Sequence, residues 1–167
     1  MAERGLSPVR IAVIDDDQDI LVFMKRALEA RGHEVFTFTN PGICPLQRIR
    51  ECRCKANEKC VDLIITDIDM PEMNGFKFLE QHLSKDCHCR DVCIVTGRLG
   101  SYEVAKAAAL SCKAFCKPLQ LEKLFIYVDS VAANIPATRR LRDWFLEVIP
   151  QAELQAGAAL PPRSPEC

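Results

Sequence analysis

The stretch of sequence that decides the fold is LIITDIDMPEMNGFKFL, residues 63–79. Its first residues complete VDLIIT (61–66), a short apolar run that predicts a strand buried on both faces. Residues 74–84 carry apolar side chains in helical spacing, which predicts an amphipathic helix. A short loop that begins with Asp67 therefore joins a buried strand to a helix.

The same alternation of strand and helix continues in both directions along residues 8–135. Apolar strand patterns occupy residues 10–14, 34–39, 61–66, 91–96 and 113–116, and helical patterns occupy residues 18–31, 43–51 (the weakest), 74–84, 102–110 and 119–133. Strands that alternate with helices form a parallel sheet covered on both faces, and right-handed crossovers leave few topologies. We therefore predict an α/β, flavodoxin-like (βα)5 doubly wound parallel sheet with strand order 2-1-3-4-5.

The remaining residues, 136–167, predict an extra C-terminal helix and a flexible tail. The helix is expected from Ala137 to Ile149, with Leu141 and Trp144 on its apolar stripe. Such a stripe packs either on its own domain or on a partner, and a homodimer is one such arrangement. The tail, AGAALPPRSPEC, is of low complexity.

The length and composition of the chain argue against several classes of protein. The chain has 167 residues, enough for one domain with a substantial core. Its net charge of −1 argues against a generally basic nucleic-acid binder, so no direct nucleic-acid contact is expected. No apolar run reaches the length of a membrane span, and MAERGLSPVR lacks a signal core, so we expect a cytoplasmic protein without membrane contact. In that compartment the 10 cysteines are expected to be reduced thiols or metal ligands.

Polar residues follow the predicted strands where a parallel sheet places its functional sites, beyond the carboxyl ends. Asp15 and Asp16 follow the first strand, and Asp67 follows the third. Clustered carboxylates repel one another unless a hard cation such as Mg²⁺ compensates. Thr96 and Lys117 end the next two strands and add a hydroxyl and a fixed positive charge. This set suits a transferring phosphoryl group, with Asp67 as the nucleophile.

Taken one at a time, these residues have ordinary structural explanations. An acidic run before a helix commonly caps that helix, which is the role expected for Asp17. A lone aspartate at a strand end is usually a turn residue. The functional interpretation depends on all four strand ends carrying suitable residues in the right order.

The segments VIDDD (13–17), LIITDIDMPEMNGFKFL (63–79), VTG (95–97) and CKPL (116–119) together resemble a response regulator receiver domain. The resemblance implies that Asp67 accepts a phosphoryl group from a histidine kinase or phosphotransfer protein, in a two-component phosphorelay that switches partner binding. It implies Mg²⁺, replaceable by Mn²⁺, held by Asp15, Asp16, Asp67 and the backbone carbonyl of Asp69. Thr96 would be the switch hydroxyl, and Lys117 would pair with the phosphoryl oxygen after a cis bond to Pro118. Such a protein is a signalling phosphoacceptor rather than an enzyme acting on other substrates.

The sequence departs from the family pattern in one switch position. The family usually has an aromatic residue three positions before the lysine, where this chain has Ala114, with Phe115 next. Two other functions stay open. A pseudo-receiver would be a metal- or thiol-bearing interaction module, although the acidic and lysine set is complete. A haloacid dehalogenase-type phosphatase also uses an Asp-x-Asp motif, but its acidic metal ligands follow the lysine.

A second group of residues is not explained by that resemblance. It consists of cysteines and a histidine that precede the third and fourth predicted strands: Cys52, Cys54, Cys60, Cys87, His88 and Cys89. Loops at the amino ends of neighbouring strands lie close together, so these residues are expected to meet opposite the Asp67 edge. They can supply a zinc site, an iron–sulfur centre or a redox-sensitive disulfide. They can also be independent reduced thiols, because the spacing matches no standard zinc finger.

Overall fold

The computed structural model describes residues 6–143. Their core is a five-stranded parallel sheet of order β2-β1-β4-β5-β6. The strands of this sheet are β1 (Arg10–Ile14), β2 (Glu34–Phe38), β4 (Leu63–Thr66), β5 (Asp91–Thr96) and β6 (Lys113–Cys116). Because a two-residue strand, β3 (Glu58–Lys59), precedes β4, this order is the predicted 2-1-3-4-5. The flavodoxin-like fold is therefore confirmed.

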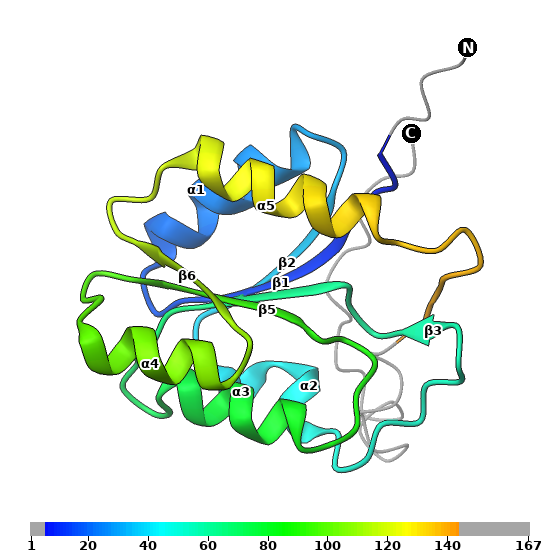
Figure 1. Cartoon of the computed structure of the whole chain (residues 1–167), viewed down its shortest axis with the longest axis horizontal. Helices are drawn as coiled ribbons and strands as arrows, with labels where there is room; N and C mark the ends of the chain where they lie inside the picture. The colour runs from blue at the N-terminus through cyan, green and yellow to red at the C-terminus, as the bar shows by residue number, and fades with distance from the viewer. Residues whose placement is uncertain (1–5, 144–167) are drawn as a thin grey trace, which may run out of the picture.

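Helices cover both faces of the sheet (Figure 1). They are α1 (Gln18–Glu29), α2 (Pro45–Arg48), α3 (Gly75–Leu83), α4 (Ser101–Ala109) and α5 (Leu121–Ala133). One apolar layer joins α1 and α5 to the sheet, and the other joins α2, α3 and α4 to it. Asp17 caps α1 by accepting from the N–H groups of Asp19 and Ile20, as predicted.

The predicted helix over residues 43–51 is wrong in its extent. A 3₁₀ turn, Pro41–Ile43, is followed by the four-residue α2, which begins at Pro45. Proline lacks an N–H and is tolerated only in the first turn of a helix. Pro45 therefore starts a new helix, and Ile49 already has an extended backbone.

The predicted C-terminal helix is also wrong over its described part, residues 137–143. The chain instead forms β7 (Arg140–Leu141), which pairs in parallel with β3. The Arg140 N–H donates to the Asn57 carbonyl at 2.7 Å, and the Arg142 N–H donates to the Lys59 carbonyl at 2.9 Å. Backbone pairing with a distant segment thus replaces the helical hydrogen bonds that the local pattern suggested. The rest of that helix and the tail lie outside the described residues.

Within residues 6–143, no helix combines the length and the apolar character that crossing a membrane requires.

Candidate functional site

Three aspartates converge at the carboxyl edge of the sheet. β1 and β4 pair in register, Ile14 beside Thr66, so the residues that follow them are neighbours. The Asp67 N–H donates to the Ile14 carbonyl at 2.9 Å and continues the ladder past the strand end. One carboxylate oxygen from each of Asp15, Asp16 and Asp67 lies within 4.8 Å of the other two. The predicted convergence is thus present in the structure.

Lys117 brings a positive charge to these carboxylates. Its Nζ lies 2.8 Å from Asp15 Oδ2 and 3.5 Å from Asp67 Oδ2. Burial by itself lowers the pKa of Lys117, but the hydrogen bonds and charges of Asp15 and Asp67 together outweigh burial and raise it. The lysine is therefore held protonated against the two acids. The peptide bond from Lys117 to Pro118 is cis, as expected.

Asp67 is almost completely buried and has a raised pKa. It is 7% exposed, and its Oδ1 accepts the Ile68 N–H at 2.8 Å. Burial raises the pKa of Asp67 above its ordinary value, and the charge of Asp15 adds to this rise while Lys117 opposes it. The site therefore favours additional positive charge beside Asp67.

The residues present fit a hard divalent cation. Carboxylate oxygens are the protein ligands that Mg²⁺ prefers, and it commonly uses only one or two of them together with water and phosphate. Asp15 is buried whereas Asp16 is exposed, so the cluster opens to solvent on one side. Asp69 does not join the cluster through its side chain, which is 55% exposed and lies 3.5 Å from Arg98. The role expected for its backbone carbonyl stays a prediction.

Thr96 ends β5 with a fully buried side chain. Its hydroxyl accepts the Arg98 N–H at 3.2 Å and lies 3.3 Å from the Arg98 carbonyl oxygen. Phe115 cannot replace the missing aromatic residue, because successive side chains of a strand point to opposite faces. It packs in the α1 and α5 layer against Tyr127, at a ring distance of 5.9 Å, whereas Ala114 packs in the other layer.

Gly75 is a site residue that the sequence analysis did not identify. A Cβ atom at this position would lie 1.9 Å from the backbone oxygen of Asp67. Its N–H donates to the Ile68 carbonyl at 2.9 Å, so α3 begins directly against the loop that carries Asp67. The available signal was the Asn74-Gly75 pair, since Asn74 caps α3 through the Phe76 N–H.

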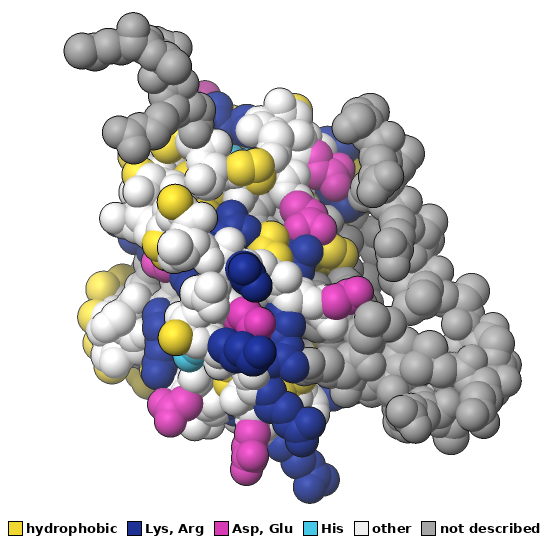
Figure 2. Space-filling view, turned by 90° about the vertical axis from the view of Figure 1, so that its right-hand side faces the viewer, with side chains coloured by type: hydrophobic (Ala, Val, Ile, Leu, Met, Phe, Trp, Pro, Cys, Tyr) yellow, Lys and Arg dark blue, Asp and Glu magenta, His cyan; other side chains and the backbone are white. Residues whose placement is uncertain are grey.

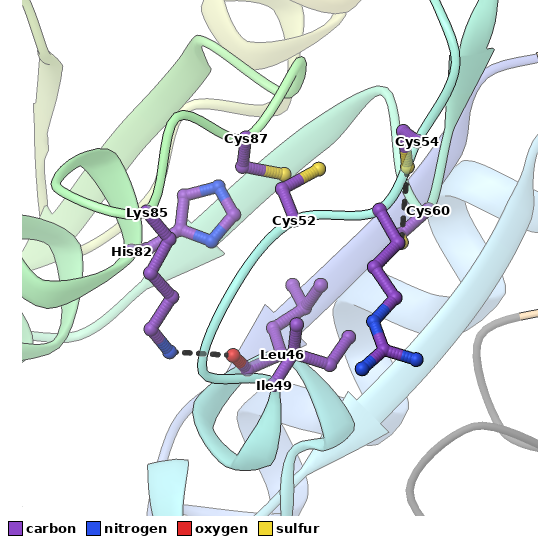
Figure 3. Close-up of a pocket in the computed structure, with 9 residues that line it drawn as sticks. Leu46, Ile49, Cys52, Cys54, Cys60, His82, Lys85 and Cys87 are labelled. Carbon is purple, nitrogen blue, oxygen red and sulfur yellow. Dashed lines mark hydrogen bonds between the residues drawn. The ribbon is translucent and has the colours of Figure 1, made fainter.

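The predicted second cluster is brought together only in part. Cys52, Cys54, Cys60 and Cys87 line one small cavity (Figure 3). His88 and Cys89 do not line it: His88 Nδ1 is 3.0 Å from the Glu58 carbonyl oxygen, and the fully buried Cys89 donates to the Asp91 carbonyl.

Comparisons with known proteins identify sequence relatives of this chain. The family described as response regulator receiver domain matches residues 11–129. The chemotaxis protein CheY of Treponema pallidum is 32% identical over 127 residues, which cover 75% of this chain and 83% of that protein. The two-component response regulator ARR10 of Arabidopsis thaliana is 39% identical over 72 residues, 43% of this chain. The matches span only 12% of ARR10 and 23% of its relative ARR11.

Solved structures show the same fold. A CheY-like receiver domain protein from Methanospirillum hungatei JF-1 superposes with a TM-score of 0.62 at 24% identity, covering 76% of this chain and 95% of that one. The non-phosphorylated HemR receiver domain from Leptospira biflexa also has a TM-score of 0.62, at 22% identity over 76% of this chain and 95% of its own.

Proposed function

This chain belongs to the response regulator receiver domain family, and from that membership we propose that Asp67 accepts a phosphoryl group in a two-component phosphorelay. The donor is the phosphohistidine of a histidine kinase or of a phosphotransfer protein. The phosphorylated domain then binds a downstream protein differently from the unmodified one. In this function the chain is a signalling phosphoacceptor.

One observation carries this proposal. Lys117 Nζ lies 2.8 Å from Asp15 and 3.5 Å from Asp67, and Asp16 completes the acidic cluster. A nucleophilic carboxylate, further acids for a cation and a fixed ammonium group therefore surround one point at the sheet edge. Phosphoryl transfer depends mainly on such positioning and charge stabilisation.

The residues have distinct roles in the transfer. The Ile68 N–H holds Asp67 Oδ1, which leaves Oδ2, on the lysine side, to attack phosphorus. A phosphorus–oxygen bond forms as the phosphorus–nitrogen bond to the donor imidazole breaks, and the imidazole nitrogen leaves with the electron pair. Lys117 stabilises the negative charge on the phosphoryl oxygens.

Asp15 and Asp16 would hold the metal together with Asp67, and the backbone carbonyl of Asp69 would add a further ligand. When bound, Mg²⁺, or Mn²⁺ in its place, supplies positive charge to the transferring group. The raised pKa of Asp67 agrees with a site that binds a cation to complete its charge balance.

Thr96 is the proposed switch residue. Its hydroxyl must leave the Arg98 backbone groups, at 3.2 and 3.3 Å, to donate to a phosphoryl oxygen on Asp67. Arg98 and the loop after β5 then lose one hydrogen-bond partner. Because Ala114 stands where the family usually has an aromatic residue, we expect the conformational response to phosphorylation to pass through this loop.

The test is phosphorylation of the purified chain with acetyl phosphate and Mg²⁺. Wild type is expected to gain one phosphoryl group, which hydroxylamine removes because an acyl phosphate is labile to it. Asp67→Asn should gain none, whereas Asp69→Asn, the same change on an exposed neighbour, should gain the label. Undiminished labelling of Asp67→Asn would refute the assignment. Repeated turnover of a generic phosphate ester would favour a phosphatase instead.

A further inference from the structure

Four thiols from two separate segments meet at the sheet edge opposite Asp67. Cys52 and Cys54 precede β3, Cys60 directly follows it, and Cys87 precedes β5. Figure 1 shows β3 at the end of the molecule where the sheet strands begin. In Figure 3 the sulfurs of Cys52 and Cys87 point toward each other, with Cys54 and Cys60 beside them. The receiver site uses none of these residues.

Contacts link the four sulfurs to one another and to backbone donors. Cys54 Sγ lies 3.6 Å from Cys60 Sγ, and Cys52 interacts with both Cys54 and Cys87 through its side chain. The N–H groups of Cys54 and His88 lie near the Cys52 sulfur, and the Cys89 N–H lies near the Cys87 sulfur. A thiol sulfur is only a weak acceptor. Amide groups aimed at two of the sulfurs therefore suit thiolates, and such outer hydrogen bonds orient metal ligands.

The four thiols line one part of a small cavity. Its volume is about 10 Å³, roughly that of one water-sized sphere. It is lined by the four cysteines and by neighbours that include His82. His82 is 1% exposed, and its Nε2 lies 3.1 Å from the Cys89 carbonyl oxygen. This space is too small for an organic ligand.

Two basic side chains, Arg53 and Lys85, line the same cavity as the four thiols. Basic side chains gather on this end of the molecule (Figure 2), which offsets the charge of a tetrathiolate site. Full ionisation of the four thiols needs a cation between them.

We propose that Cys52, Cys54, Cys60 and Cys87 bind one structural zinc ion. Zinc prefers four tetrahedral thiolate ligands in closed structural sites. Binding breaks four S–H bonds, forms four Zn–S bonds and releases four protons to solvent. With Zn–S bonds of about 2.3 Å the sulfurs must lie about 3.8 Å apart. Within residues 6–143, the three aspartates are the only group of three or more ligand atoms that lie within 4.8 Å of one another. The four sulfurs are therefore farther apart than zinc requires, and the two cysteine segments must move closer together as zinc binds.

The zinc ion would tie the receiver core to the segment that follows α5. β3 lies between Cys54 and Cys60, and its only partner strand within the described residues is β7. Arg10 reinforces this junction, because its guanidinium donates to the Arg142 carbonyl at 2.8 Å. Ordering β3 therefore orders β7, on the side of the molecule away from Asp67.

The first test is elemental analysis of the full chain purified without added metal or chelator. We expect about one zinc ion per chain. Cys52→Ser and Cys87→Ser should each lose most of this zinc. Cys112→Ser should retain it, because that buried thiol lies outside the cavity and a hydroxyl keeps its hydrogen bond to the Lys113 carbonyl. A chelator should lower the melting temperature of wild type and of Cys112→Ser but not that of Cys52→Ser.

A second measurement is independent of the folding of variants. Titration of the metal-free wild-type chain with Co²⁺ should give the intense visible absorption of tetrahedral thiolate cobalt, and added Zn²⁺ should abolish it. Less than roughly a tenth of an equivalent of zinc, with every thiol titrating freely, would overturn the proposal. Disulfides in place of metal would overturn it as well. Phosphorylation of Asp67 should be unchanged in Cys52→Ser, so failure here is distinct from failure of the phosphoacceptor function.

Discussion

The substitution Gly75→Ala should damage both the stability and the chemistry of the phosphoacceptor site. The new Cβ would lie 1.9 Å from the Asp67 oxygen, 2.9 Å from the Asp67 carbonyl carbon and 3.2 Å from Ile68 Cα. Contacts under 3.0 Å essentially never occur for a real Cβ, so the two backbones must separate by about 1.1 Å, the difference between 1.9 and 3.0 Å. The obstructing atoms belong to the backbone, so no side-chain rotation relieves this contact.

Two opposing effects decide how much Gly75→Ala changes the free energy of unfolding. Alanine is intrinsically better than glycine in a helix by about 1 kcal/mol. Overpacking against a rigid neighbour costs about 1–3 kcal/mol or more, and here the neighbour is the main chain of the active loop. We expect a net loss of up to about 2 kcal/mol in the free energy of unfolding. A displacement of about 1 Å at Asp67 should also slow phosphorylation by roughly 100-fold.

Urea denaturation and the rate of labelling by acetyl phosphate measure the two effects. Gly97→Ala is the matched control, because a Cβ at Gly97 meets nothing within 4 Å. Its stability should change by less than about 0.5 kcal/mol. If Gly75→Ala were as stable as wild type and were labelled at the wild-type rate, the close approach of α3 to the Asp67 loop would not position the nucleophile.

Two further changes test the charge balance and the switch. Burial raises the pKa of Asp67, so the folded state binds its proton more tightly and stability falls as pH rises from the ordinary value of 3.8 through the folded pKa. Without divalent cations Asp67→Asn should therefore be more stable than wild type at neutral pH, by urea denaturation, and Mg²⁺ should narrow the gap; equal midpoints in the absence of metal would contradict this reasoning. Thr96→Ala leaves the Arg98 N–H without its 3.2 Å partner and should lower the free energy of unfolding by about 1 kcal/mol. It should still accept the phosphoryl group, but lose the hydrogen–deuterium exchange response of the loop after β5; a wild-type response would exclude Thr96 as the switch.

Much of the fold and of the aspartate site was predictable from local patterns. Strands such as RIAVI and DVCIVT are apolar and β-branched, and they alternate with helices, which is sufficient to predict a parallel sheet. Parallel strands align their carboxyl ends, so Asp15 and Asp67 had to meet once the strand order was known. The sequence alone therefore predicted the convergence of these acids with Lys117.

The tertiary structure decided those features that depend on contacts between residues far apart in the sequence. The spacing of Leu141 and Trp144 predicts a helix over residues 137–149, but backbone hydrogen bonds to the segment around β3 make Arg140–Leu141 a strand. Cys60 lines the small cavity and Cys89 does not, because the two side chains point in different directions between packed loops. Residue spacing carries no information about these directions. Gly75 is required because two backbones touch, a contact that exists only after α3 docks against the Asp67 loop. Local propensity and periodicity determine the helices and strands and their order along the chain. Contacts between these elements determine the β7 strand, the directions of the cysteine side chains and the need for Gly75, because the free energy of such contacts is gained only when the elements pack.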